Sequence, residues 1–124
     1  MLIQRFDKPI VHTIGQLPIT IFRNMFGLFS RKKSERINKY LSKNAQLLDV
    51  RSSSEFNASS LPGSLNVPVQ SIDSRMSEID KTRPVVVYCA MGGRSTIAAA
   101  KLKSKGYKVV DAGGIKTVSK HLKK

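Results

Sequence analysis

The chain has 124 residues, of which 22 are Lys or Arg and 8 are Asp or Glu, so its formal net charge is +14. This length suits one domain with its own apolar core, and a single cysteine excludes an internal disulfide. The two histidines, His12 and His121, lie far from that cysteine in the sequence, so neither a metal site nor a cofactor is predicted. These features favour a reducing, cytoplasmic setting.

The excess of positive charge extends over the whole chain and is dense near its end. From Lys101 onward there are eight lysines and a single acidic residue, Asp111. Such a surface attracts anions in general, including small oxyanions and acidic proteins. Nucleic-acid binding is not expected, because no pattern of exposed aromatic residues accompanies the charge. A lysine-rich face that only keeps the protein soluble is a better explanation of the charge than dedicated nucleic-acid binding.

Residues 1–30 differ from the remainder and are predicted to be an apolar and basic N-terminal extension that packs on the domain or is poorly ordered. Its apolar stretch, residues 17–29, is too short to span a membrane and lacks the cleavage pattern of a secretory signal. Because a basic run at residues 31–33 follows directly, residues 17–33 predict peripheral contact with a membrane surface. Met25 is a second candidate for the translation start.

From residue 31 onward, short apolar runs alternate with segments of helical spacing, which predicts one α/β domain over residues 31–124. Four strands are predicted, at residues 47–50, 64–68, 85–88 and 108–111. Helices are predicted at residues 34–41, 52–56, 71–79, 95–102 and 115–122, and Gly106 ends the fourth. This alternation implies a mostly parallel sheet flanked by helices on both faces, because right-handed crossovers place helices over the sheet.

Cys89 follows the third apolar run and precedes a glycine-bearing turn, so it lies at the carboxyl end of a predicted strand. Ligands bind at this edge of open parallel sheets. A buried cysteine with a purely structural role is the plain alternative, but such a residue needs neither glycines nor a cation beside it. Here Gly92 and Gly93 allow backbone amides to turn inward, Ser95 is placed to cap the next helix, and Arg94 adds a permanent cation.

A thiol beside a helix N-terminus and a cation has a lowered pKa, roughly 3.5–7.5 in known cases. Cys89 is therefore a candidate nucleophile that works without a histidine base. The same N–H groups would stabilise an anion carried on the sulfur, such as a persulfide.

The segment Cys89-Ala90-Met91-Gly92-Gly93-Arg94-Ser95 resembles the active-site loop of rhodanese-type sulfurtransferases, which has the form C-x-x-G-x-R-[ST]. Three further segments, residues 48–56, 61–68 and 111–114, resemble other elements of that family in the family's order. The resemblance covers roughly residues 34–124. It departs from the family pattern in lacking any tryptophan, which is common in the last helix of such domains.

The resemblance implies that Cys89 takes the outer sulfur of an anionic donor such as thiosulfate and passes it from a persulfide to a thiol or cyanide. The six loop residues after Cys89 would bind the donor, with their amides around the sulfur and Arg94 orienting the anion. Asp49, Arg51 and Glu55 are predicted to support the site, with Asp49 or Glu55 paired with an arginine. Because the chain has no second cysteine, the acceptor must come from outside, as a thiol or an acidic protein partner.

Two alternatives remain open. One is a module that carries sulfur or docks a partner without turning over thiosulfate, since Ala90 and Met91 offer little hold on a dianion. The other, less favoured, is a phosphatase or arsenate reductase of the same fold. Those enzymes use a cysteine loop one residue longer, whereas only four residues separate Cys89 from Arg94, and this loop has no aspartate to act as a general acid.

Overall fold

The computed structural model describes residues 19–123, which fall into two units that divide between Lys32 and Lys33 and are described separately. The first unit contributes the beginning of helix α2 (Ile19–Ser42). Four large hydrophobic side chains of this stretch are exposed: Ile21 (41%), Met25 (47%), Leu28 (48%) and Phe29 (64%). In the part of the chain that the structure describes, no helix is long and apolar enough to cross a membrane. Most of the predicted extension, including residue 17, lies outside the described residues.

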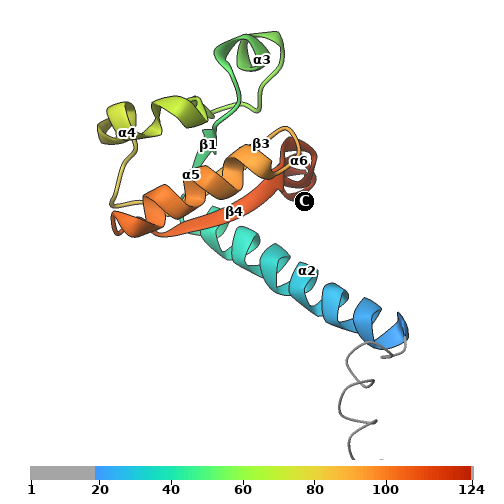
Figure 1. The fold of residues 1–124 in the computed structure, drawn as a ribbon. Helices are drawn as coiled ribbons and strands as arrows, with labels where there is room; N and C mark the ends of the chain where they lie inside the picture. Colours follow the sequence, from blue (N-terminus) through green and yellow to red (C-terminus); the bar gives the residue numbers. More distant parts are fainter. Residues whose placement is uncertain (1–18, 124) are drawn as a thin grey trace, which may run out of the picture. The chain divides into compact units, whose positions relative to one another are not determined.

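A wholly parallel four-stranded sheet forms the centre of the second unit, Lys33–Lys124 (Figure 1). Its strands are β1 (Gln46–Asp49), β2 (Leu65–Asn66), β3 (Val85–Cys89) and β4 (Val109–Gly114). They lie in the order β2-β1-β3-β4, and each neighbouring pair is parallel. The α/β fold with a parallel sheet is confirmed.

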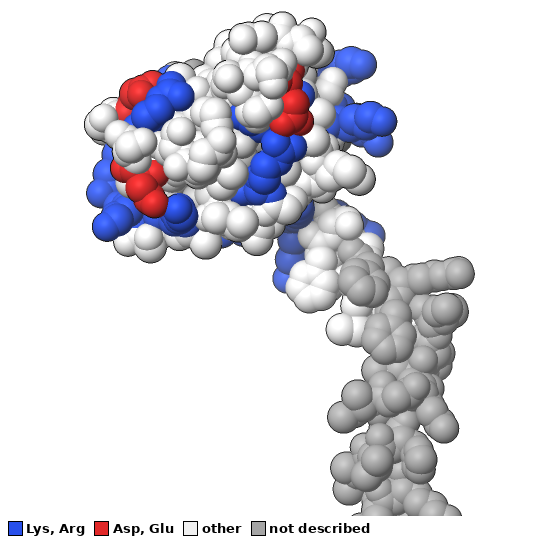
Figure 2. Space-filling view, turned by 45° about the horizontal axis from the view of Figure 1, so that its top comes forward, with Lys and Arg blue, Asp and Glu red and all other residues white. Residues whose placement is uncertain are grey.

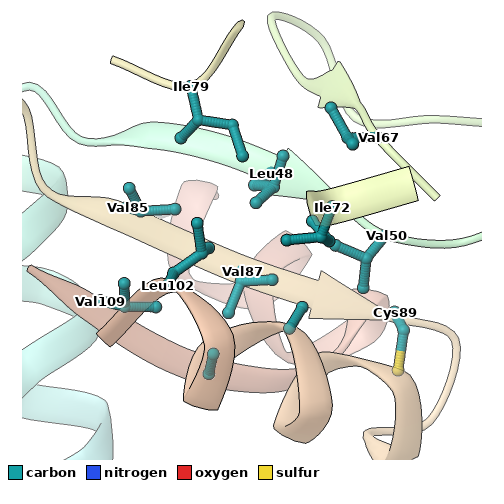
Figure 3. Packing of buried hydrophobic residues seen from close by; sticks show 12 residues of the cluster. Leu48, Val50, Val67, Ile72, Ile79, Val85, Val87, Cys89, Leu102 and Val109 are labelled. Carbon is teal, nitrogen blue, oxygen red and sulfur yellow. The ribbon is translucent and has the colours of Figure 1, made fainter. Parts of the chain in front are cut away.

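Helices cover both faces of this sheet, as predicted, because successive side chains of a strand point to opposite faces. Val85, Val87 and Cys89 of β3 face α4 (Ile72–Arg75) and α5 (Gly93–Ser104), in the cluster drawn in Figure 3. Val86 and Tyr88 point to the other face, where they pack with buried residues of α6 (Ile115–Leu122) and of the last turns of α2. Burial on both faces explains why β3 is a continuous apolar run.

Two predicted helices differ from the structure. The helix predicted at residues 34–41 begins much earlier, at Ile19, because α2 continues through the apolar stretch that precedes the domain. Residues 71–79, predicted as one helix, contain the single α turn α4 between two 3₁₀ turns, η1 (Val69–Ser71) and η2 (Met76–Glu78). The Tyr107 hydroxyl lies 3.1 Å from the carbonyl oxygens of Met76 and Ile79, so these acceptors are satisfied outside a regular helix.

The short helix α3 (Ser53–Ala58) begins with a capping box. The Ser52 hydroxyl accepts the Glu55 backbone N–H, and the Glu55 carboxylate accepts the Ser52 backbone N–H, each at 3.2 Å. This reciprocal pair fixes Glu55 at the start of α3, which follows the carboxyl end of β1.

Candidate active site

Cys89 is the last residue of β3, at the carboxyl edge of the sheet where it was predicted. Figure 3 shows its sulfur directed away from the apolar cluster to which the rest of the side chain belongs. The residue is only 1% exposed, and its Sγ accepts a hydrogen bond from the Gly92 backbone N–H at 2.9 Å. The chain has turned back on itself within three residues, so a backbone N–H of the loop faces the sulfur.

The environment of the thiol sets two opposing effects on its pKa. Burial raises the pKa of Cys89. Hydrogen bonds lower it by a larger amount; they come from the backbone N–H and hydroxyl of Ser95 and from the backbone N–H groups of Gly92 and Met91. The net pKa is below the ordinary value for cysteine. The thiolate is thus favoured by dipoles of neutral groups, and no histidine of residues 19–123 is among these hydrogen-bond partners.

The position of Ser95 corrects a prediction. We expected Ser95 to cap the helix after the loop, but α5 begins at Gly93 and its N-cap is Gly92. Ser95 instead lies in the first turn, fully buried, and its hydroxyl donates to the Gly92 carbonyl at 2.9 Å. Gly92 has a φ of +126°, a backbone conformation that residues with a side chain rarely adopt, so a glycine is needed where the loop enters the helix.

Gly113 and Gly114 at the end of β4 brace the cysteine loop, a role that sequence reasoning missed by assigning them only to a turn. A Cβ added to Gly114 would lie 2.9 Å from the Ala90 carbonyl oxygen, and one added to Gly92 would lie 3.6 Å from the Gly113 Cα. A register shift between β3 and β4 pairs Cys89 with Gly114. The only signal for this contact in the sequence was the resemblance of residues 111–114 to a family element.

Arg94 points to Glu55 of α3, 39 positions away in the sequence. Its two terminal nitrogens donate to the two carboxylate oxygens of Glu55, at 2.6 and 3.1 Å. The hydrogen bonds from Arg94 lower the pKa of Glu55 to about 2, with a further contribution from Ser52. Both side chains are more than a third exposed, so the pair closes one side of the site at the protein surface.

Asp49 and Arg51 form a second ion pair, beneath the first. Asp49 is fully buried at the end of β1, and its carboxylate binds the Arg51 guanidinium, with a shortest distance of 2.7 Å. Arg51 also donates to the Ser59 carbonyl at 2.7 Å, and the Asn66 side chain donates to the carbonyls of both pair members. The pair therefore joins the ends of β1 and β2 to the segment after α3.

Met91 is the most exposed large hydrophobic residue among those described, at 93%. It lies in the turn between Cys89 and the first residue of α5, so its thioether is in solvent at the outer surface of the loop, which we call the mouth of the loop. No cluster of three or more His, Cys, Asp and Glu residues that could hold a metal occurs within residues 19–123. The structure therefore brings together the predicted loop from Cys89 to Ser95 and, through Arg94, Glu55.

Residues 34–121 match the family model described as "Rhodanese-like domain". The chain belongs to the rhodanese-like domain family. The match contains the whole sheet, the cysteine loop and both ion pairs. The four motifs noted in the sequence all fall within it.

Similar proteins agree with this membership. A sulfurtransferase of Allochromatium vinosum is 42% identical over 77 residues, which are 60% of this chain and 72% of that protein. The thiosulfate sulfurtransferase GlpE of Pseudomonas savastanoi pv. phaseolicola is 32% identical over 79 residues, 64% of this chain and 74% of that protein. Six other curated relatives are longer, and the chain covers between 13% and 49% of their lengths.

A solved structure shows the same fold. The rhodanese-related protein from Thermoplasma volcanium superposes with a TM-score of 0.60 at 26% sequence identity, over 70% of this chain and 87% of that one. The arrangement of the parallel sheet around the cysteine loop is therefore that of the rhodanese fold.

Proposed function

We propose that the protein transfers sulfane sulfur through a persulfide formed on Cys89. The observation that carries the proposal is the setting of the sulfur, which ends a buried strand and accepts the Gly92 N–H at 2.9 Å. A ring of amides around a single sulfur stabilises both the thiolate and a negatively charged outer sulfur bound to it. Membership of the rhodanese-like family and the similarity to curated sulfurtransferases support the same chemistry.

The reaction takes two steps, and each exchanges one sulfur–sulfur bond for another. In the first, the Cys89 thiolate attacks the outer sulfur of the donor, a new S–S bond forms, and the remainder of the donor leaves with the electron pair of the broken bond. In the second, an acceptor thiolate attacks the outer sulfur of the persulfide, and Cys89 leaves as the thiolate. Cys89 is the only cysteine of this sequence, so the acceptor thiol belongs to another molecule.

The loop geometry supports sulfur transfer over phosphate-ester hydrolysis. Four residues separate Cys89 from Arg94, and the guanidinium of Arg94 is already held by both oxygens of Glu55. A phosphoryl group needs donors around three outer oxygens, whereas an outer sulfur needs them around a single atom. The loop also lacks an acid to protonate a leaving alkoxide.

Intact-protein mass spectrometry tests the proposal. After incubation with thiosulfate or with cysteine persulfide, we expect at least one donor to add one sulfur atom to the wild type and none to add sulfur to Cys89→Ser. Addition of cyanide or a thiol should return the wild type to its original mass. A wild type that gains no sulfur from either donor, or that releases phosphate from an aryl phosphate instead, would overturn the proposal.

A further inference from the structure

The two arginines of the site, Arg94 and Arg51, are each paired with an acid. Arg94 is the only charged residue between Cys89 and Ser95, and its bidentate pairing with Glu55 at 2.6 and 3.1 Å leaves no net charge at that side. Arg51 is likewise held by Asp49. On the face that Figure 2 draws, acidic groups lie against basic ones, and other basic groups lie apart from any acidic group.

Two further charged groups of opposite sign, Asp111 and Lys33, lie beside Gly113. Asp111 accepts the Gly113 backbone N–H at 3.0 Å and the Thr96 hydroxyl at 2.9 Å. The Lys33 ammonium lies 3.4 Å from the position that a Cβ on Gly113 would take. One acid and one base therefore flank this side. With Cys89 ionised, the groups described here sum to about one negative charge.

A dianion is a poor partner for such a site. Thiosulfate carries two negative charges and must approach a thiolate, so the Coulomb term opposes the encounter unless cations offset it. The donors that surround the sulfur are neutral: the N–H groups of Gly92, Met91 and Ser95 and the Ser95 hydroxyl. The mouth of the loop presents the apolar side chain of Met91, which is 93% exposed and cannot hold an anion.

We infer that the sulfur donor is an alkyl persulfide, R–S–SH, rather than thiosulfate; this inference rests on the proposed sulfur transfer at Cys89. A persulfide group carries at most one negative charge against the two of thiosulfate, it reacts with the thiolate in its protonated form, and its carbon-bearing part can contact Met91. The Cys89 thiolate attacks the outer sulfur, the S–S bond of the donor breaks, and R–S⁻ leaves with the electron pair. The outer sulfur and its proton remain on Cys89, so atoms and charge balance without an oxidant or reductant.

The experiment compares rates of sulfur loading on Cys89, measured by intact mass, for thiosulfate and for two persulfides. The persulfides are cysteine persulfide, a small zwitterion, and a persulfidated cysteine desulfurase, a protein donor. In the wild type we expect at least one persulfide to load more than about tenfold faster than thiosulfate, and the two arms show whether the carrier is small or a protein. Equal or faster loading from thiosulfate would overturn the inference while leaving sulfur transfer intact.

Two variants test the charge argument directly. Glu55→Gln keeps the capping box but frees the charge of Arg94, and Met91→Lys places a new cation at the mouth of the loop. Each should raise the thiosulfate loading rate about three- to tenfold. This is the effect expected of one positive charge about 6 Å from a dianion in water: about tenfold without salt and about threefold when salt screens the charge. Using two variants guards against distortion of the loop by either one.

Matched controls separate the local charge from other effects. Met91→Gln removes the thioether without adding charge. Ser77→Lys adds the same charge as Met91→Lys, but in η2. This turn packs on Tyr107, just before β4 begins, so it lies at the amino ends of the strands, away from Cys89. Neither control should raise the thiosulfate rate. If Met91→Lys and Glu55→Gln load from thiosulfate no faster than these controls, loop charge does not select the donor. Absence of loading from every donor would overturn the proposed function itself.

Discussion

At the scale of single residues, the protonation of Cys89 depends on hydrogen bonds that a small substitution can remove. Burial alone would raise the pKa of the thiol, and the donors from Ser95, Gly92 and Met91 outweigh this, so the pKa lies below the ordinary value for cysteine. The reactive form is the thiolate, so the loading rate should rise with pH through the pKa of Cys89 and become constant above it. The pH at half of the maximal rate should lie below that of an ordinary cysteine, because the hydrogen bonds lower the pKa of Cys89.

Ser95→Ala tests this balance. Loss of the hydroxyl removes one of the groups that lower the pKa of Cys89, so the half-maximal point of the pH profile should move to higher pH. The measurement is the single-turnover loading rate between pH 6 and pH 10. Ser104→Ala, at the other end of α5, is the matched control because its hydroxyl bonds only the Lys101 carbonyl at 2.6 Å. Identical pH profiles for the two variants would contradict the role of the hydroxyl.

Residue types around the site could be predicted, but their partners could not. The loop from Cys89 to Ser95 is contiguous, so its residues are close together whatever the fold. Glu55 and Arg94 meet because the carboxyl ends of β1 and β3 lie side by side, with Asp49 opposite Tyr88. Sequence spacing does not specify which acid faces which arginine over 39 positions.

At the scale of elements, the ends of the strands position the loop. Gly114 of β4 approaches the Ala90 carbonyl so closely that Gly114→Ala would place a Cβ 2.9 Å from that oxygen. We expect a loss of about 1–3 kcal/mol in the free energy of unfolding and slower sulfur loading, because the loop must shift. Gly27→Ala is the control, since a Cβ there meets no atom within 4 Å. Equal stability of both variants would contradict the close approach.

The pair at the end of β1 is a separate test of what holds this edge together. Asp49→Asn would leave the Arg51 guanidinium buried without its acid, at a cost of about 3 kcal/mol in the free energy of unfolding. The exposed pair of Arg75 and Glu78 provides a control, because Glu78→Gln should cost less than about 1 kcal/mol. Urea unfolding measures both. Comparable losses would mean that burial does not strengthen the first pair.

Strand positions followed from the sequence more reliably than helix boundaries. A strand buried on both faces must be a continuous apolar run, and Val85–Tyr88 has no other good place in a small domain. The limits of a helix depend on contacts that periodicity does not contain. Residues 71–79 have apolar positions at helical spacing, yet the Tyr107 hydroxyl near the Met76 and Ile79 carbonyls accompanies the 3₁₀ geometry there.

At the scale of the whole molecule, the peripheral membrane contact expected from residues 17–33 stays a prediction. Helical spacing places Ile21, Met25 and Leu28 of α2 on one side, and each is more than 40% exposed. The basic run at residues 31–33 follows them and complements anionic lipid.

Vesicles that contain phosphatidylserine test this contact by co-sedimentation. The double variant Met25→Glu, Leu28→Glu should reduce the bound fraction about tenfold, because apolar surface no longer enters the lipid boundary. The control Gly27→Glu, Ser30→Glu changes the charge equally but on sides of α2 that lie away from Met25 and Leu28, so its loss should be smaller. Equal losses would show that only charge matters, and a wild type that does not sediment would contradict the contact.

The burial of Cys89 has a consequence for how long a captured sulfur would survive. A persulfide on an exposed residue is quickly reduced by the thiols of its surroundings, but Cys89 is 1% exposed and ends a fully buried strand. The inner sulfur of its persulfide would therefore be shielded by the protein, and only the outer sulfur would face the loop. Reductants could attack the persulfide only at its outer sulfur. The lifetime of the persulfide would therefore depend on which molecules are able to enter the loop rather than on the intrinsic reactivity of the S–S bond.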